Sequence, residues 1–137
     1  MQYREIFSSL AQGRVCNQGK RQILSGKNHL YVLWTNDNPI TMEKMVFMYT
    51  VNSLARGWWD EITLIIWGTP TKLVNEDKKA QRLVQNAIKA GVQLVACKAC
   101  ADQLGVSDDL EKMNIEVKYT GELLTDILKG EEKLITI

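Results

Sequence analysis

Short apolar runs recur along the chain at intervals that suit strands separated by helices. The clearest are HLYVLW at residues 29–34, EITLIIW at residues 61–67 and GVQLVA at residues 91–96. Residues 115–119 and 133–137 form two shorter candidates. The first three runs are almost continuously apolar instead of alternating, which is typical of strands covered on both faces in a parallel sheet.

Helical patterns fill the intervals between these runs. Asn38 followed by Pro39 is typical of a helix start, and this helix is expected to end near Gly57. Asn75 is expected to cap the next helix, whose apolar positions repeat with helical spacing until Gly91 ends it. Three shorter helices are expected at residues 99–104, 107–113 and 120–129.

The alternation of strands and helices predicts the fold class. From residue 29 onward the order is β-α-β-α-β-α-β-α-β, which indicates a three-layer α/β/α domain with a mainly parallel five-stranded sheet. The pattern leaves the strand order open, and it leaves open an antiparallel last strand at an edge. Residues 1–28 lie outside the alternation, so we interpret them as an N-terminal extension of a domain over residues 29–137.

Composition narrows the class of protein and its partners. The 137 residues are 45% hydrophobic and 24% charged, with a formal net charge of +1, as expected for a globular domain with no nucleic-acid or membrane partner. No apolar stretch approaches the roughly 20 residues of a membrane span, and the first residues do not resemble a signal peptide. Three cysteines are sparse, which fits a reducing compartment, so we expect a cytoplasmic protein.

Ligands of open parallel sheets bind beyond the carboxyl ends of the strands, where three loops are expected here. The first loop holds Asn36 and Asp37, which either contact a ligand or cap the following helix. The second holds Gly68 and Thr69, in a turn before Pro70 that can offer backbone amides to a ligand. The third loop spans residues 97–100. We expect these loops to share one rim of the sheet.

The third loop carries the most reactive side chains of the sequence. Cys97 ends a predicted strand, and Cys100 lies in the first turn of the next helix. Helix amides and the helix dipole favour an anion there, which lowers the pKa of a thiol, and Lys98 adds a positive charge close by in sequence. Both cysteines can instead be small buried apolar residues. We favour reactive thiols, with Cys97 and Cys100 as the candidate catalytic residues.

Metal and nucleotide chemistry have little support in the sequence. A structural zinc site needs about four ligands, and Cys16 and His29, the other soft ligands, lack ligand spacing. His29 opens a strand and is interpreted as structural. Neither G-x-G-x-x-G nor G-x-x-x-x-G-K-[ST] occurs. We therefore predict no metal site and no cofactor.

Taken together, these motifs resemble the DsrE/DsrF family of sulfur-relay proteins. The similar stretches are LYVLWTNDNP, the Met-rich segment after it, WWDEITLIIWGTPTKL and AGVQLVACKACADQLGV, within residues 29–137. The most specific of them is the third strand ending in cysteine. The similarity is closest to stand-alone members of the family, and residues 1–28 depart from the family pattern.

The resemblance implies a three-layer domain that forms a homo-oligomer, commonly a trimer or a hexamer. It also implies that the cysteine at the end of the third strand, Cys97 here, accepts sulfane sulfur as a persulfide and passes it on. The partners would be sulfur donor and acceptor proteins or small sulfane-sulfur compounds. Cys100 is an additional cysteine that not every relative shares, and it would modulate or resolve the persulfide.

Three functional hypotheses follow. The first is a sulfur carrier, sulfurtransferase-like if it is active as an enzyme, with Cys97 as the acceptor. The second is a thiol–disulfide redox protein that uses Cys97 and Cys100 as a pair. The third is a non-enzymatic oligomeric binding protein that uses the rim for a ligand or partner, because a fold alone does not establish a function.

Overall fold

The computed structural model describes residues 28–137, and five strands form its single sheet. The strand order is β4-β3-β2-β1-β5, and every neighbouring pair is parallel. The predicted five-stranded parallel sheet is confirmed, and the last strand is parallel as well. The predicted extension lies outside the described residues except for residue 28. The strands are β1 His29–Trp34, β2 Glu61–Ile66, β3 Gln93–Cys97, β4 Glu116–Lys118 and β5 Lys133–Thr136.

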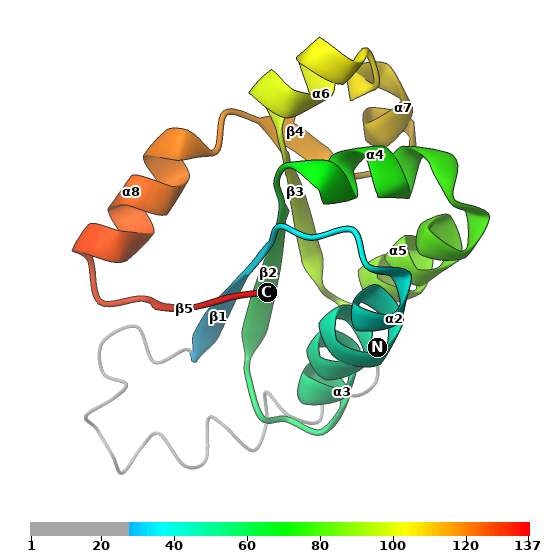
Figure 1. Cartoon of the computed structure of the whole chain (residues 1–137). Coiled ribbons are helices and arrows are strands. Elements are labelled where there is room, and N and C mark those ends of the chain that lie inside the picture. The colour runs from blue at the N-terminus through cyan, green and yellow to red at the C-terminus, as the bar shows by residue number, and fades with distance from the viewer. Residues whose placement is uncertain (1–27) are drawn as a thin grey trace, which may run out of the picture.

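Helices cover the two faces of the sheet unequally. Figure 1 shows α8 by itself on one side, with the helices that follow β1 and β2 on the other. This arrangement gives the three layers that the alternation of elements predicted. The helical segments are α2 Pro39–Thr41, the π-helical η1 Met42–Phe47, α3 Met48–Ala55, α4 Thr69–Glu76, α5 Lys78–Ala90, α6 Lys98–Leu104, α7 Ser107–Lys112 and α8 Gly121–Lys129.

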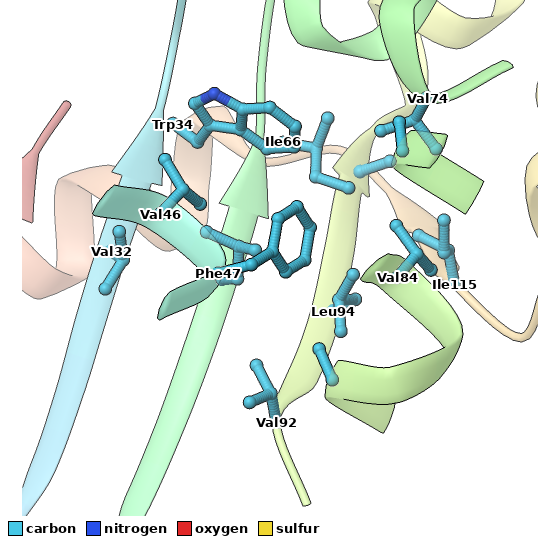
Figure 2. Packing of buried hydrophobic residues seen from close by; sticks show 14 of the residues in the cluster. Val32, Trp34, Val46, Phe47, Ile66, Val74, Val84, Val92, Leu94 and Ile115 are labelled. Atoms are coloured by element: carbon cyan, nitrogen blue, oxygen red, sulfur yellow. The ribbon is translucent and has the colours of Figure 1, made fainter. Parts of the chain in front are cut away.

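The larger core lies between the sheet and the many-helix layer. Figure 2 shows Trp34 of β1 and Ile66 of β2 packed above Phe47, whose ring meets the Trp34 ring edge-on with centroids 5.5 Å apart. A smaller cluster of Leu33, Ile65 and Ile127 holds α8 on the opposite face. Each fully buried aliphatic or aromatic side chain contributes about 1.5–3 kcal/mol to this packing. Burial on both faces explains why the central strands are almost continuously apolar.

Local capping follows the sequence at the first helix. The Asn38 side chain accepts hydrogen bonds from the amides of Ile40 and Thr41, both at 2.9 Å, and Pro39 begins α2. The predicted start is therefore confirmed. The helix continues as the π-helical turn η1, which the apolar spacing did not anticipate because a π-turn adds a residue without changing the residue types.

The prediction for the second helical segment was wrong in two respects. Residues 68–70 do not form only a turn, because Gly68 precedes a full helix, α4, with Pro70 in its first turn. Asn75 lies inside α4 and does not cap the following helix. Asp77 does so, accepting from the amides of Lys79 at 2.7 Å and Ala80 at 3.1 Å. Asn75 and Asp77 are both of a residue type that caps helices, and only the position of the break between α4 and α5 shows which of them does so.

Candidate functional site

The parallel pairing of the three central strands brings their carboxyl ends to one edge of the sheet. β1 and β2 are in register from residue 29 to residue 34, and β2 pairs with β3 up to Ala96. The loops after β1 and β2 are in contact, since Thr69 Oγ1 donates a hydrogen bond to the Thr35 carbonyl at 3.3 Å. The rim expected from the order of elements is therefore formed, and the third loop adds both thiols to it.

Cys97 occupies the last position of β3 and the N-cap position of α6, and its side chain is only 4% exposed. Burial by itself raises the pKa of this thiol. The Thr120 hydroxyl, the Cys100 thiol and the amides of Cys100 and Ala99 donate toward the sulfur and outweigh burial, so the pKa is lowered. The site therefore favours a thiolate at Cys97.

Cys100 is half-buried one helical turn later and behaves in the opposite way. Burial is the main cause that raises the pKa of this thiol, and its hydrogen bond and proximity to the Cys97 sulfur raise it further. The Gly68 amide lowers the pKa but does not reverse the shift. Of the two thiols, Cys97 is therefore the one that loses its proton more readily.

Thr120 is a site residue that sequence reasoning missed. It stands at the N-cap of α8, more than twenty residues after Cys97, and its side chain is 1% exposed. Its hydroxyl makes no hydrogen bond of standard geometry within residues 28–137, yet it lowers the pKa of Cys97. The hydroxyl thus acts on the thiol from a different element. A threonine before a helix is an ordinary capping signal, so the sequence gives no hint of this contact.

Gly68 connects the second loop to the thiols. Its φ of 85° lies in the left-handed region that favours glycine, and its amide contacts the Cys100 sulfur. A Cβ at this position would meet the Thr35 carbonyl oxygen at an ordinary 3.9 Å, so the backbone conformation and not space selects glycine. The Gly68 amide is therefore used at the Cys100 sulfur, whereas the offer of backbone amides to a ligand stays a prediction.

A groove of about 730 Å³ opens beside Cys100, between α4, α6 and the loop after β1. Of the residues named from the sequence, Asp37, Gly68, Thr69 and Cys100 line it. Cys97 is not part of the lining and is buried. The lining residues that sequence reasoning missed, because they face the rim only through the placement of α4 and α6, are Lys72, Leu73, Glu76, Gln103 and Leu104.

Two residues expected at the rim are used elsewhere. Asn36 accepts a hydrogen bond from the Asn38 amide at 3.0 Å, so it shapes the loop before α2 and does not line the groove. Lys98 pairs with Asp102 at 3.0 Å and lies over the Tyr119 ring, 5.9 Å from its centroid. Its charge is therefore engaged along α6, and hydrogen bonds do the main work of lowering the pKa of Cys97.

The described residues show neither a cluster for a metal ion nor a membrane-spanning helix. In residues 28–137, no three His, Cys, Asp or Glu side chains gather where they could ligate a metal. No helix in that part of the chain is long and apolar enough to cross a membrane. Cys16, the remaining cysteine, lies outside the described residues.

Comparison with known proteins places this site in a family. The model of the DsrE/DsrF-like family matches residues 31–136. The chain belongs to the DsrE/DsrF-like family. It is also similar to a solved structure of a conserved protein of unknown function from Bacteroides thetaiotaomicron, with 38% identity and a TM-score of 0.79 over 80% of this chain and 95% of that chain. No curated protein matches the chain.

Membership confirms the resemblance noted in the sequence and suggests a role of the sulfur-relay kind. The matched span includes both thiols and every lining residue of the groove. The solved relative carries no assigned function in its description, so it supports the fold. The chemistry has to be argued from the thiols themselves.

Proposed function

We propose that this protein is a sulfur carrier that accepts sulfane sulfur on Cys97 as a persulfide and relays it to a partner. The observation that carries the proposal is the set of donors around one buried sulfur: a threonine hydroxyl, a second thiol and two helix amides converge on Cys97. These donors stabilise a thiolate, which is the reactive form of a cysteine. Family membership supports the same role.

The transfer step needs only thiol chemistry. The Cys97 thiolate attacks the outer sulfur of a persulfide donor, R–S–SH. A bond forms between Cys97 Sγ and that sulfur, the S–S bond of the donor breaks, and the electron pair of that bond leaves on R–S⁻. The leaving thiolate takes up a proton from solvent, which balances the proton that Cys97 released on becoming a thiolate. The net change is Cys97–SH plus R–S–SH to Cys97–S–SH plus R–SH, with no external oxidant.

Intact mass spectrometry of the reduced protein after incubation with inorganic polysulfide tests the proposal. We expect wild type and Cys100→Ser to gain one sulfur atom and Cys97→Ser to gain none. Peptide mapping should place the added sulfur on Cys97. Cys97→Ser that loads as much sulfur as wild type would overturn the assignment of Cys97.

A thiol–disulfide redox role is the second candidate, because the Cys100 thiol donates directly toward the Cys97 sulfur. Oxidation of the pair would remove two hydrogen atoms and form one S–S bond, with a glutathione disulfide as the electron acceptor. Equilibration in glutathione redox buffers, followed by mass analysis, would reveal it. If no intramolecular disulfide forms over the whole range of buffers, this candidate is eliminated.

We further propose a cytoplasmic homo-oligomer, a trimer or a hexamer, that exchanges sulfur with donor and acceptor proteins or with small sulfane-sulfur compounds. Residues 1–28 would extend the domain formed by residues 29–137. Light scattering coupled to size-exclusion chromatography measures the oligomer directly. A monomer at micromolar concentration would contradict this part of the proposal.

A further inference from the structure

We infer that the groove beside Cys100 binds a dipolar peptide thiol of low molecular weight and takes sulfur from the persulfide of that thiol. The inference rests on the proposed function and names the class of its donor. It is argued from the charged side chains and the apolar lining of the groove described above, and from the burial of the two thiols.

Charged side chains of both signs line the groove without internal partners. Within residues 28–137, no ion pair or hydrogen bond engages the side chains of Asp37, Lys72 or Glu76. Some surface charges elsewhere in this part of the chain do pair, such as Lys79 with Glu43 at 2.7 Å and Lys98 with Asp102 at 3.0 Å. Lys72 and Glu76 stand one helical turn apart, a spacing that allows a pair, yet both are left for a ligand.

The signs of these charges fit a ligand that is itself dipolar. Lys72 can bind a carboxylate, whereas Asp37 and Glu76 can bind an ammonium group. A purely anionic donor would meet two carboxylates for one lysine, which disfavours it. A ligand that carries both an amino-acid ammonium and a carboxylate matches all three side chains.

The remaining lining suits a short peptide. Leu73 and Leu104 offer apolar surface, and Leu104 is 47% exposed although it belongs to a helix packed on the core. Gln103 adds an amide that can donate to and accept from a peptide group. A volume of about 730 Å³ falls within the usual range of about 300–1,000 Å³ for small-molecule sites.

The burial of the thiols favours a small donor molecule over a folded donor protein. Cys100 lines the groove, and Cys97, whose pKa it affects, is buried with only 4% exposed. A cysteine on the surface of a folded protein would have to enter the groove to reach Cys97, whereas a small thiol can place its sulfur at the inner end. The leaving thiol would then lie beside Cys100.

The transfer from the peptide persulfide follows the same balanced chemistry as the carrier step proposed above. The outer sulfur of the peptide persulfide becomes bonded to Cys97 Sγ, the donor S–S bond breaks, and the peptide thiolate leaves with its electron pair. It takes a proton from solvent, which balances the proton that Cys97 released on becoming a thiolate. The products are the Cys97 persulfide and the free peptide thiol, and no oxidation or reduction from outside is required.

Rate constants for loading Cys97 test the inference, measured by intact mass with the persulfide of the dipeptide cysteinylglycine, which carries one ammonium and one carboxylate, and with the uncharged hydroxyethyl persulfide. We expect wild type to prefer the dipeptide persulfide. In Lys72→Met, and in Asp37→Asn combined with Glu76→Gln, the ratio of the two rate constants should fall roughly 3- to 10-fold, as expected for loss of a charge-assisted contact in a partly open site. The matched control is Lys78→Met, an exposed lysine on α5 that does not line the groove, and it should keep the wild-type ratio.

The outcomes separate this inference from the proposed function. If inorganic polysulfide loads Cys97 but the ratio is near one in wild type, or is unchanged in both groove variants, the dipolar donor is wrong and the carrier stands. Loading from a persulfidated protein alone, with neither small persulfide active, would also overturn the inference. Loading from no donor at all would overturn both.

Discussion

The two ends of the parallel sheet use polar residues in opposite ways. At the amino-terminal end of the strands, polar groups satisfy one another: His29 Nε2 lies 2.8 Å from Thr63 Oγ1, which donates to Gln93 Oε1 at 3.1 Å, and His29 Nδ1 lies 3.4 Å from Glu61. At the carboxyl-terminal end, charged side chains line a groove without partners among residues 28–137, and the pKa values of two neighbouring thiols shift in opposite directions.

This difference distinguishes a structural cluster from a site. A closed network fixes side chains and stabilises the strands, because each buried polar group has its partner. Charged groups without partners can bind a ligand, and thiols whose pKa values are shifted in opposite directions can take part in chemistry. The contacts of His29 within the closed network also support its interpretation as a structural residue. If this distinction is correct, changes at the carboxyl-terminal end of the strands should affect sulfur loading, and changes at the amino-terminal end should affect stability.

Replacement of Cys97 should have the largest effect on the chemistry. Because its pKa is lowered, wild type should show a thiolate absorbance that appears as pH rises through a value below the ordinary cysteine range. In Cys97→Ser this step should vanish completely. The pKa of Cys100 should then move down, since the hydrogen bond and charge of Cys97 both raise it, but burial should keep it elevated. Ultraviolet titration of both single variants measures this.

If the early step survives in Cys97→Ser and disappears in Cys100→Ser, the order of the two thiols is reversed. The groove-lining cysteine would then be the thiolate, and the assignment of the acceptor would have to change with it.

Thr120→Val should lower the reactivity of Cys97 without abolishing it. The variant keeps the side-chain shape but removes the hydroxyl that lowers the pKa of Cys97, so this pKa should rise and less thiolate should form at neutral pH. Removal of this polar contact should slow sulfur loading roughly 2- to 10-fold. Thr71→Val is the matched control, because it removes another buried hydroxyl without a partner, in α4. A Thr120→Val rate equal to wild type would show that the hydroxyl does not act on the thiol.

Thr63→Val should affect stability alone. It deletes the hydroxyl between His29 and Gln93 at the opposite end of the sheet. Breaking this network should cost about 1–3 kcal/mol in the free energy of unfolding, while sulfur loading of the folded protein stays at the wild-type rate. Denaturant melts paired with the mass assay decide the matter. Slower loading by the folded variant would mean that the two ends of the sheet are coupled.

Asp77→Ala should have the smallest effect. It removes the N-cap of α5, where the carboxylate accepts from two backbone amides. The expected cost is about 1 kcal/mol in the free energy of unfolding, with sulfur loading unchanged. Asp77→Ser, which retains a capping oxygen, should recover most of the loss in the same melts. Equal losses for alanine and serine would assign the effect to something other than capping.

The sequence by itself determined the alternation of strands and helices and the position of Cys97. Almost continuous apolar runs can be satisfied only between two covering layers, so the parallel three-layer sheet followed from them. Asn38 and Gly91 fixed helix ends through backbone preferences that act over a few residues. These signals are local, and they placed a cysteine where a strand passes into a helix.

Only the tertiary structure decided what surrounds that cysteine. The order β4-β3-β2-β1-β5, the helix α4 and the capping of α5 by Asp77 instead of Asn75 depend on packing between distant segments. The same packing brings Thr120 to Cys97, Gly68 to Cys100, and Lys72 and Glu76 to the groove. A hydrogen bond to sulfur depends on distance and direction in space, and residues far apart in sequence acquire these only when the sheet has formed.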